Sequence, residues 1–127
     1  MPTRLIARHD TADLPRFRAL DTDGTPLSLA GATVTYTLRE RAGTAYLVLH
    51  GAATVANQET NPGEAYYRWG DGETGTDSAA LVALAYGAYK DYVEEWEVHF
   101  ADGTIETFPK RPQDRVIVRI LADLDNT

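Results

Sequence analysis

The side chains most able to do chemistry in this sequence are three histidines, and they lie far apart. His9, His50 and His99 occupy separate segments, with no carboxylate at a spacing diagnostic of a metal site. Zinc binding would require the imidazoles to converge in the fold, which the spacing neither supports nor excludes. We interpret them as exposed or hydrogen-bonded strand histidines, and His99 should face solvent because it alternates with Val98 and Phe100.

A serine nucleophile would have to be Ser28 or Ser78, the two serines of the chain. Such a nucleophile needs a neighbouring base and oxyanion donors, and neither serine lies in a glycine-flanked elbow. Ser78 is instead typical of a helix start. The sequence therefore predicts no serine-based hydrolysis.

Three glutamates close together, Glu94, Glu95 and Glu97, have the residue type of an acid/base pair. In a strand, Glu95 and Glu97 share the solvent face, whereas Glu94 shares a face with Tyr92 and Trp96. A carboxylate on an apolar face must either lie near the sheet margin or pair with an arginine. The sequence leaves both alternatives open.

The loop from Asp71 to Asp77 is the acidic segment best suited to calcium, which prefers several oxygen ligands on a flexible turn. Its spacing does not match an EF-hand loop, and a solvated loop that ends in a helix cap explains it. A turn likewise explains the residues from Asp21 to Gly24. We therefore expect no cofactor and no metal site, and we do not expect an enzyme.

Composition narrows the class of protein further. The chain has 127 residues, enough for one domain with a substantial core, and it has no cysteine for disulfides or thiolate sites. Its nineteen acidic and twelve basic residues give a net charge of -7, which disfavours binding to a nucleic-acid backbone. No apolar run is long enough for a membrane span, and the first residues do not resemble a signal peptide.

The elements that would position these side chains are mostly strands. Two alternating runs, residues 92–100 and 105–109, are joined through Asp102 and Gly103. Asp-Gly between such runs favours a hairpin with a type I′ turn, which requires positive φ at both central residues. Further strands are expected at residues 3–8, 14–20, 33–39, 46–50, 53–56, 64–69 and 114–121, with a bend at Gly51.

One short helix is expected at residues 79–85, after the capping residues Asp77 and Ser78. Seven or eight strands with regular turn signals and almost no helix predict an all-β fold, an immunoglobulin-like antiparallel β-sandwich with the helix in an insert. We expect a single domain over residues 1–127, with residues 1–13 as an amino-terminal arm and residues 122–127 as a polar tail.

Aromatic residues could belong to the core or to a binding surface. Trp69 and Trp96 lie on apolar strand faces and are expected in the core, although exposed indoles would suit sugar stacking. Tyr86, Tyr89 and Tyr92 cluster around a glycine and are harder to bury completely. Because exposed aromatic residues are enriched at protein interfaces, these three tyrosines are our candidate contact residues.

Three stretches carry a resemblance to a known family. They are residues 23–39, which read Asp-Gly-Thr-Pro-Leu-Ser-Leu-Ala-Gly-Ala-Thr-Val-Thr-Tyr-Thr-Leu-Arg, then residues 66–69 and residues 96–109. Over about residues 14–121 the chain resembles the amino-terminal domain of phage baseplate upper proteins. The family usually has a compact Gly-x-Tyr before the hairpin, and here a longer insert at residues 71–88 takes that place.

This resemblance implies an immunoglobulin-like fold and a role as an assembly module in virions. We therefore expect a non-enzymatic structural or adaptor protein of a tailed bacteriophage, present in the virion and synthesised in the host cytoplasm. Its expected partners are other virion proteins and repeated copies of itself in a symmetric assembly, without nucleic acid or membrane. The alternative is a carbohydrate- or receptor-binding β-sandwich module, and an enzyme ranks third.

Overall fold

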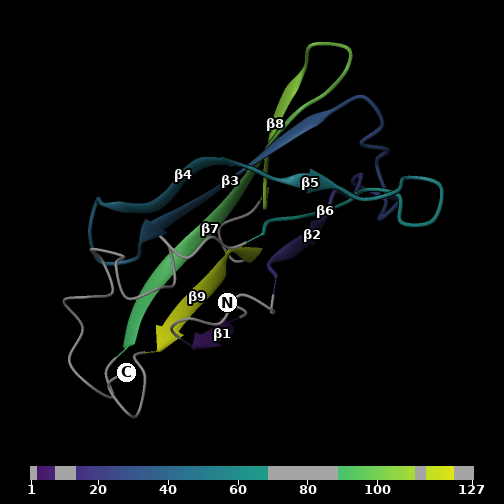
Figure 1. The fold of residues 1–127 in the computed structure, drawn as a ribbon. Helices are drawn as coiled ribbons and strands as arrows, with labels where there is room; N and C mark the ends of the chain where they lie inside the picture. Colours follow the sequence, from purple (N-terminus) through teal and green to yellow (C-terminus); the bar gives the residue numbers. More distant parts are fainter. Residues whose placement is uncertain (1–2, 8–13, 69–88, 111–113, 122–127) are drawn as a thin grey trace.

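The computed structural model describes residues 3–7, 14–68, 89–110 and 114–121. Within these ranges the chain forms nine β-strands and no α-helix (Figure 1). The strands are β1 (Thr3–Ala7), β2 (Arg16–Arg18), β3 (Thr33–Glu40), β4 (Tyr46–Ala52), β5 (Thr54–Val55), β6 (Glu64–Tyr66), β7 (Tyr89–His99), β8 (Ile105–Phe108) and β9 (Val116–Leu121). The helix expected at residues 79–85 lies outside the described residues, as do Ser78 and the loop from Asp71 to Asp77.

The larger sheet is built around the long strand β7. Its order is β1-β9-β7-β3-β4, and β8 pairs with β7 beyond the end of β9. β3 runs antiparallel to β7 over residues 92–99 of β7, while β9 pairs with residues 89–94 and β8 with residues 96–99. β1 is added to the outer edge of β9 in parallel. The expected amino-terminal arm is therefore in part an edge strand.

The smaller sheet has the antiparallel order β2-β6-β5 and covers one face of the larger sheet (Figure 1). The neighbouring strands β2, β6 and β5 correspond to B, E and D of an immunoglobulin domain, and β3, β4, β7 and β9 correspond to C, C′, F and G. The predicted immunoglobulin-like β-sandwich is thus confirmed. The parallel pairing of β1 with β9 departs from a purely antiparallel arrangement.

Alternation along the strands places the core between the two sheets. In β3, Val34, Tyr36 and Leu38 are buried, as the period of two predicts. Tyr36 lies against Trp96, with 4.6 Å between ring centroids, and Phe17 of the smaller sheet stacks on the same indole at 4.7 Å. The rings of both sheets therefore interlock, and burial of such aromatic side chains supplies a large share of the stabilising free energy.

The hairpin between β7 and β8 forms where Asp-Gly predicted it, but with a different loop. Gly103 has a φ of 91°, whereas Asp102 is not among the described residues with positive φ. Phe100 N–H donates to Thr104 O at 2.9 Å, and Gly103 N–H donates to Phe100 O at 3.0 Å. The connection is therefore a three-residue loop with glycine in the left-handed region, and the expected type I′ turn is wrong.

The irregularity in β4 lies at His50, so the expected bend at Gly51 is displaced by one residue. His50 has a φ of 51°, and the pairing register with β3 shifts between Val48 and Gly51. Gly51 itself pairs with Tyr36 inside the strand. A Cβ there would lie 2.7 Å from Val48 Cγ1 and 2.8 Å from Tyr67 Cε1, so packing explains why this position lacks a side chain.

Candidate functional site

The face of the larger sheet that points away from the smaller sheet, here called the outer face, carries side chains in register rows. Thr37 of β3 lies opposite Glu95 of β7. In the next row, Arg39 lies between Tyr46 of β4 and Val93 of β7. Because the intervening residues of β3 and β7 are buried, the side chains of these rows project from the sandwich.

Most of the large exposed hydrophobic side chains among the described residues lie on this outer face. Six such side chains occur among the described residues, and five of them belong to strands of the larger sheet at outward positions. These five are Leu5, Tyr46, Leu49, Tyr89 and Ile105. The sixth, Leu20, lies beside the smaller sheet. Tyr46 and Leu49 line one groove, whereas Tyr89 and Ile105 lie at opposite ends of β7. Tyr46 and Leu49 are therefore the pair that forms a local apolar surface on this face.

Charges on the outer face nearly balance, although the whole chain is strongly acidic. Residues in or next to the strands of the larger sheet place four arginines and three acidic residues on this face, against a net charge of -7 for the protein. They are Arg39, Arg41, Arg115, Arg119, Asp91, Glu95 and Glu97. The outer face is therefore close to neutral, and the excess negative charge lies elsewhere.

Arg119 joins β9 to β7 at one end of the outer face. Its Nε and Nη2 donate to the two carboxylate oxygens of Asp91 at 2.8 and 3.0 Å, a bidentate pair across β9 and β7. The guanidinium also lies 3.9 Å from the ring centroid of Tyr89. Hydrogen bonding to Arg119 lowers the pKa of Asp91 below its usual value. Tyr89 itself is 52% exposed.

The centre of the outer face holds a shallow groove of about 180 Å³. Tyr46 and Leu49 line one side of it, and Arg39, Glu95 and Arg115 bring charges of both signs. None of these three charged side chains makes an ion pair with another residue in the part of the chain that the structure describes. The groove thus combines apolar surface with charges that are free to pair with a partner.

Beneath the sheet, Glu94 occupies the opposite, buried face of β7 and is 2% exposed. Trp96 Nε1 donates to its Oε2 at 2.7 Å, and Arg4 Nε and the Tyr36 hydroxyl donate to Oε1 at 3.3 and 3.4 Å. Of the two alternatives left open by the sequence, the arginine pairing is the one observed. Burial raises the pKa of Glu94, while Arg4 and the hydrogen bonds act in the opposite direction.

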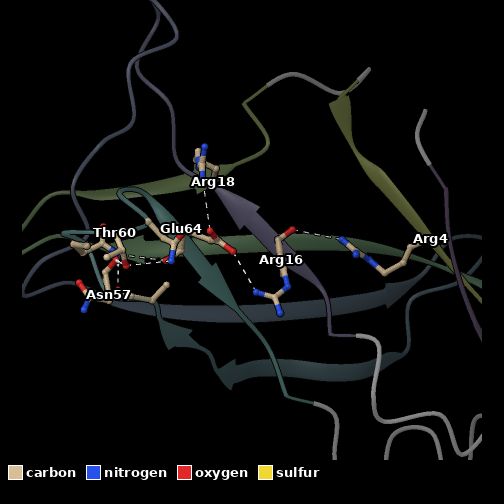
Figure 2. A network of polar contacts seen from close by, with 9 residues as sticks. Arg4, Arg16, Arg18, Asn57, Thr60 and Glu64 are labelled. Carbon is tan, nitrogen blue, oxygen red and sulfur yellow. Dashed lines mark hydrogen bonds and ion pairs between the residues drawn. The ribbon is translucent and has the colours of Figure 1, made fainter.

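Arg4 also connects the two sheets (Figure 2). Its Nη2 donates to the carbonyl oxygen of Arg16 in β2 at 3.5 Å. Arg16 and Arg18 in turn pair with Glu64 of β6, at 3.2 and 3.6 Å. This network ties β1, β2 and β6 together, and we interpret it as structural because each of its charges already has a partner.

A second hollow, of about 400 Å³, lies between β2 and β8. Phe17, Trp96 and Phe108 line it, with Glu94 at its floor. The Trp96 side chain belongs to the core at 2% exposure, as predicted, so its ring offers no flat exposed platform for a sugar. Trp69 lies outside the described residues.

The three tyrosines predicted as contact residues differ in their positions in the structure. Tyr89 is exposed on the outer face, but Tyr92 is fully buried at 0% exposure, which corrects the expectation that it would be hard to bury. The strand period explains the difference, because residues three apart on β7 point to opposite faces. Tyr86 lies outside the described residues. A contact role for Tyr89 stays a prediction.

The candidate catalytic residues do not converge. His50 and His99 lie on strands of the outer face, His50 beside Thr37 and His99 opposite Thr33, whereas Glu94 points into the core. His99 faces outward beside Glu97, with 2.6 Å between Nε2 and Oε1, as its alternation predicted. His9 lies outside the described residues.

The remaining polar candidates are explained by local structure. Ser28 accepts a hydrogen bond from the backbone N–H of Ala30 at 3.3 Å, and Asp23 accepts one from Thr25 N–H at 3.0 Å in the predicted turn. No group of three or more metal-ligating side chains occurs among the described residues. No helix in that part of the chain is long and apolar enough to cross a membrane.

Sequence reasoning missed most of the outer-face residues. Tyr46 and Leu49 fall in a predicted strand, but the run from Tyr46 to Leu49 is too uniformly apolar to show which side chains point outward. Glu95 lies on the solvent face, as its alternation predicts. Arg39 is also on the expected polar face of its strand, yet only the pairing of β3 with β4 and β7 shows that it adjoins Tyr46 and Val93.

No model of a known protein family and no curated protein matches this chain. Among solved structures, it is similar to CopC from Methylosinus trichosporium OB3b, at 16% identity and a TM-score of 0.45, covering 96% of this chain and 86% of that one. It is also similar to AggA, the major subunit of aggregative adherence fimbriae type I from Escherichia coli, at 15% identity and a TM-score of 0.30, covering 97% and 91%. These likenesses carry no argument about function.

Proposed function

We propose that this protein is a non-enzymatic structural or adaptor component of a tailed bacteriophage virion that works through protein–protein contacts. The observation that carries the contact role is that, of the six large exposed hydrophobic side chains among the described residues, five lie on the outer face of the larger sheet, with Tyr46 and Leu49 together in its groove. The virion setting is supported by the resemblance of residues 23–39, 66–69 and 96–109 to a phage baseplate domain. The proposal covers a position in the tail, the baseplate or the neck, and also a capsid accessory position.

The composition of the outer face suits a protein partner. Tyrosine and arginine are enriched at the energetic centres of protein interfaces, and Tyr46, Tyr89 and Arg39 lie on this face. Leu49, which is 56% exposed, adds apolar area beside the groove. The groove of about 180 Å³ is smaller than the pockets that usually hold small molecules, so the outer face fits a protein surface better than it fits a small molecule.

The first test is quantitative mass spectrometry of purified particles from the source. We expect the chain in a fixed ratio to the major capsid protein, with a few to a few dozen copies at a neck or tail position and hundreds for a capsid decoration protein. Absence of the chain from purified particles would overturn the virion proposal.

A matched pair of variants then tests the outer face. Leu49→Asp places a charge on it, while Leu20→Asp places the same charge on an exposed leucine elsewhere. We expect Leu49→Asp particles to lose the protein and Leu20→Asp particles to retain it. Equal incorporation of both variants would show that the outer face is not the contact.

The competing function is a carbohydrate- or receptor-binding module. The buried indole of Trp96 counts against it, because sugar stacking needs an exposed flat ring. A glycan array on the purified chain separates the two functions. We expect no glycan to bind, and saturable binding that is lost on replacing Tyr46 or Tyr89 would favour the carbohydrate module.

A further inference from the structure

We infer that the partner of the outer face is a second copy of this chain, packed face to face about a two-fold axis. This inference rests on the proposed contact function and names the occupant of that surface. Symmetric pairing of one patch with itself requires the patch to be self-complementary in charge and shape. The outer face meets the charge requirement in two ways.

The first is its neutrality. Two copies, each with a net charge of -7, repel one another wherever acidic surfaces approach. The outer face carries four arginines and three acidic residues and is therefore close to neutral, so two acidic copies can meet there without the repulsion between acidic surfaces. A strongly basic partner would bind more favourably to the acidic remainder of the surface.

The second is the position of Arg39 and Glu95. They lie on the adjacent strands β3 and β7, where Arg39 is opposite Val93 and Glu95 is opposite Thr37, one outward row apart. A two-fold axis that passes between them brings Arg39 of each copy opposite Glu95 of the other. Both groups line the groove, and neither has an ion-pair partner among the described residues of its own chain.

Apolar side chains beside this charged pair supply the burial that association needs. Tyr46 is paired with Arg39 across β4 and β3, and Leu49 lines the same groove. They are 49% and 56% exposed in the single chain, so about half of the surface of each residue is available for burial. Aromatic and aliphatic anchors next to charge pairs that become desolvated are the usual centre of a specific interface.

The β4 edge of the same sheet is a poorer site for self-association. β4 is an edge strand, but its register with β3 shifts twice, and His50 adopts a φ of 51° at one of these irregularities. Bulges of this kind twist an edge away from regular ladder pairing with another chain. Pairing through the sheet face does not require a regular edge.

Sedimentation velocity on the purified chain over a range of concentrations tests the inference. We expect a reversible monomer–dimer equilibrium whose dissociation constant rises about tenfold or more in Leu49→Asp and is unchanged in Leu20→Asp. A monomer at every concentration, or equal weakening by both substitutions, would overturn the proposal. Circular dichroism of each variant confirms that the fold is retained.

Charge reversal gives a sharper test. Glu95→Arg alone and Arg39→Glu alone should each weaken the dimer, because each brings like charges together twice across the two-fold axis. An equimolar mixture of the two variants should associate as tightly as the wild-type chain, since both opposite-charge pairs are restored. Failure of the mixture to recover affinity would contradict the assigned pairing of Arg39 with Glu95.

The outcomes separate this inference from the proposed function. A chain that is monomeric in solution, but whose Leu49→Asp variant is missing from particles, would keep the virion contact role and remove the second copy as the partner. A chain that dimerises through Arg39 and Glu95, yet is absent from purified particles, would keep the dimer and remove the virion role.

Discussion

The indole Nε1 of Trp96 donates a 2.7 Å hydrogen bond to Oε2 of Glu94, two residues earlier on the same buried face of β7. The other carboxylate oxygen accepts from Arg4 and from the Tyr36 hydroxyl. A buried carboxylate is tolerated when its oxygens are satisfied in this way. Because Arg4 belongs to β1 and Tyr36 to β3, one side chain joins three strands of the larger sheet.

Replacing Arg4 by methionine should therefore expose the cost of that buried charge. We expect Arg4→Met to lower the free energy of unfolding at neutral pH by about 3 kcal/mol, because Glu94 loses the cation that compensates it. Arg4 opposes the burial that raises the pKa of Glu94, so the variant should have a still higher pKa at that carboxyl. Urea unfolding across a pH series measures both effects.

The sign of the pH dependence follows from the raised pKa of Glu94. The folded state holds its proton at a higher pH than the unfolded state, so the stabilising contribution is complete below the ordinary carboxylate pKa and is lost as pH rises through the raised one. The deficit of Arg4→Met should accordingly shrink in acid. Arg16→Met, which loses an exposed ion pair, should cost less than about 1 kcal/mol. A pH-independent deficit would contradict this account.

Tyr92 gives a prediction of the opposite sign. Its hydroxyl is buried and has no hydrogen-bond partner among the described residues, and burial followed by the nearby Glu40 raises its pKa from 10 to about 12. Tyr92→Phe should leave stability unchanged or raise it by about 1 kcal/mol at neutral pH, because an unsatisfied polar group is removed. Thermal unfolding at neutral pH measures this change.

The dependence of stability on alkaline pH tests the same residue. A folded-state pKa raised above the unfolded value contributes stability below pH 10, and that contribution is lost as pH rises through about 12. Wild-type protein should lose stability more steeply than Tyr92→Phe in this range. A destabilised phenylalanine variant would mean that the hydroxyl has a partner after all.

Two glycines with similar backbone angles should respond differently to alanine. Gly63 and Gly24 have φ values of 81° and 87°, but a Cβ at Gly63 would lie 2.7 Å from the carbonyl oxygen of Ala19, whereas nothing lies within 4 Å at Gly24. Gly24→Ala should cost about 1 kcal/mol for the left-handed conformation alone. Gly63→Ala should cost roughly 2 kcal/mol more, because the backbone must also move. Equal losses in chemical denaturation would refute the backbone clash.

Much of the fold could be predicted because its main determinants are local. Val34, Tyr36 and Leu38 alternate with polar residues, and this alternation by itself indicates both the position of β3 and its buried face. The aspartate and glycine at residues 102 and 103 mark the hairpin. Its loop type was not predicted correctly, because Asp-Gly is compatible with more than one loop and tertiary packing decides between them.

The outer face was harder to predict because it depends on which strands become neighbours. Nothing local shows that Leu5 of β1 would lie beside Arg119 of β9, since that pairing is parallel and joins the two ends of the sequence. The register shifts in β4 also break the simple alternation that would have assigned Leu49 to a face. Glu94, in contrast, was recognisable as an anomaly, and only the identity of its partner was missing.

The backbone of His50 supplies the last prediction. It is the sole residue other than glycine with a positive φ in the described ranges, at 51°, and this region disfavours a side chain with a Cβ. His50→Gly should therefore raise the free energy of unfolding by about 0.5–1 kcal/mol. His99→Gly makes the same substitution in the regular strand β7 and should lower it by about 1 kcal/mol or more, because glycine weakens a strand interior. If both variants were destabilised equally in urea unfolding, the His50 side chain would have to make a stabilising contact in the groove that outweighs its strained backbone.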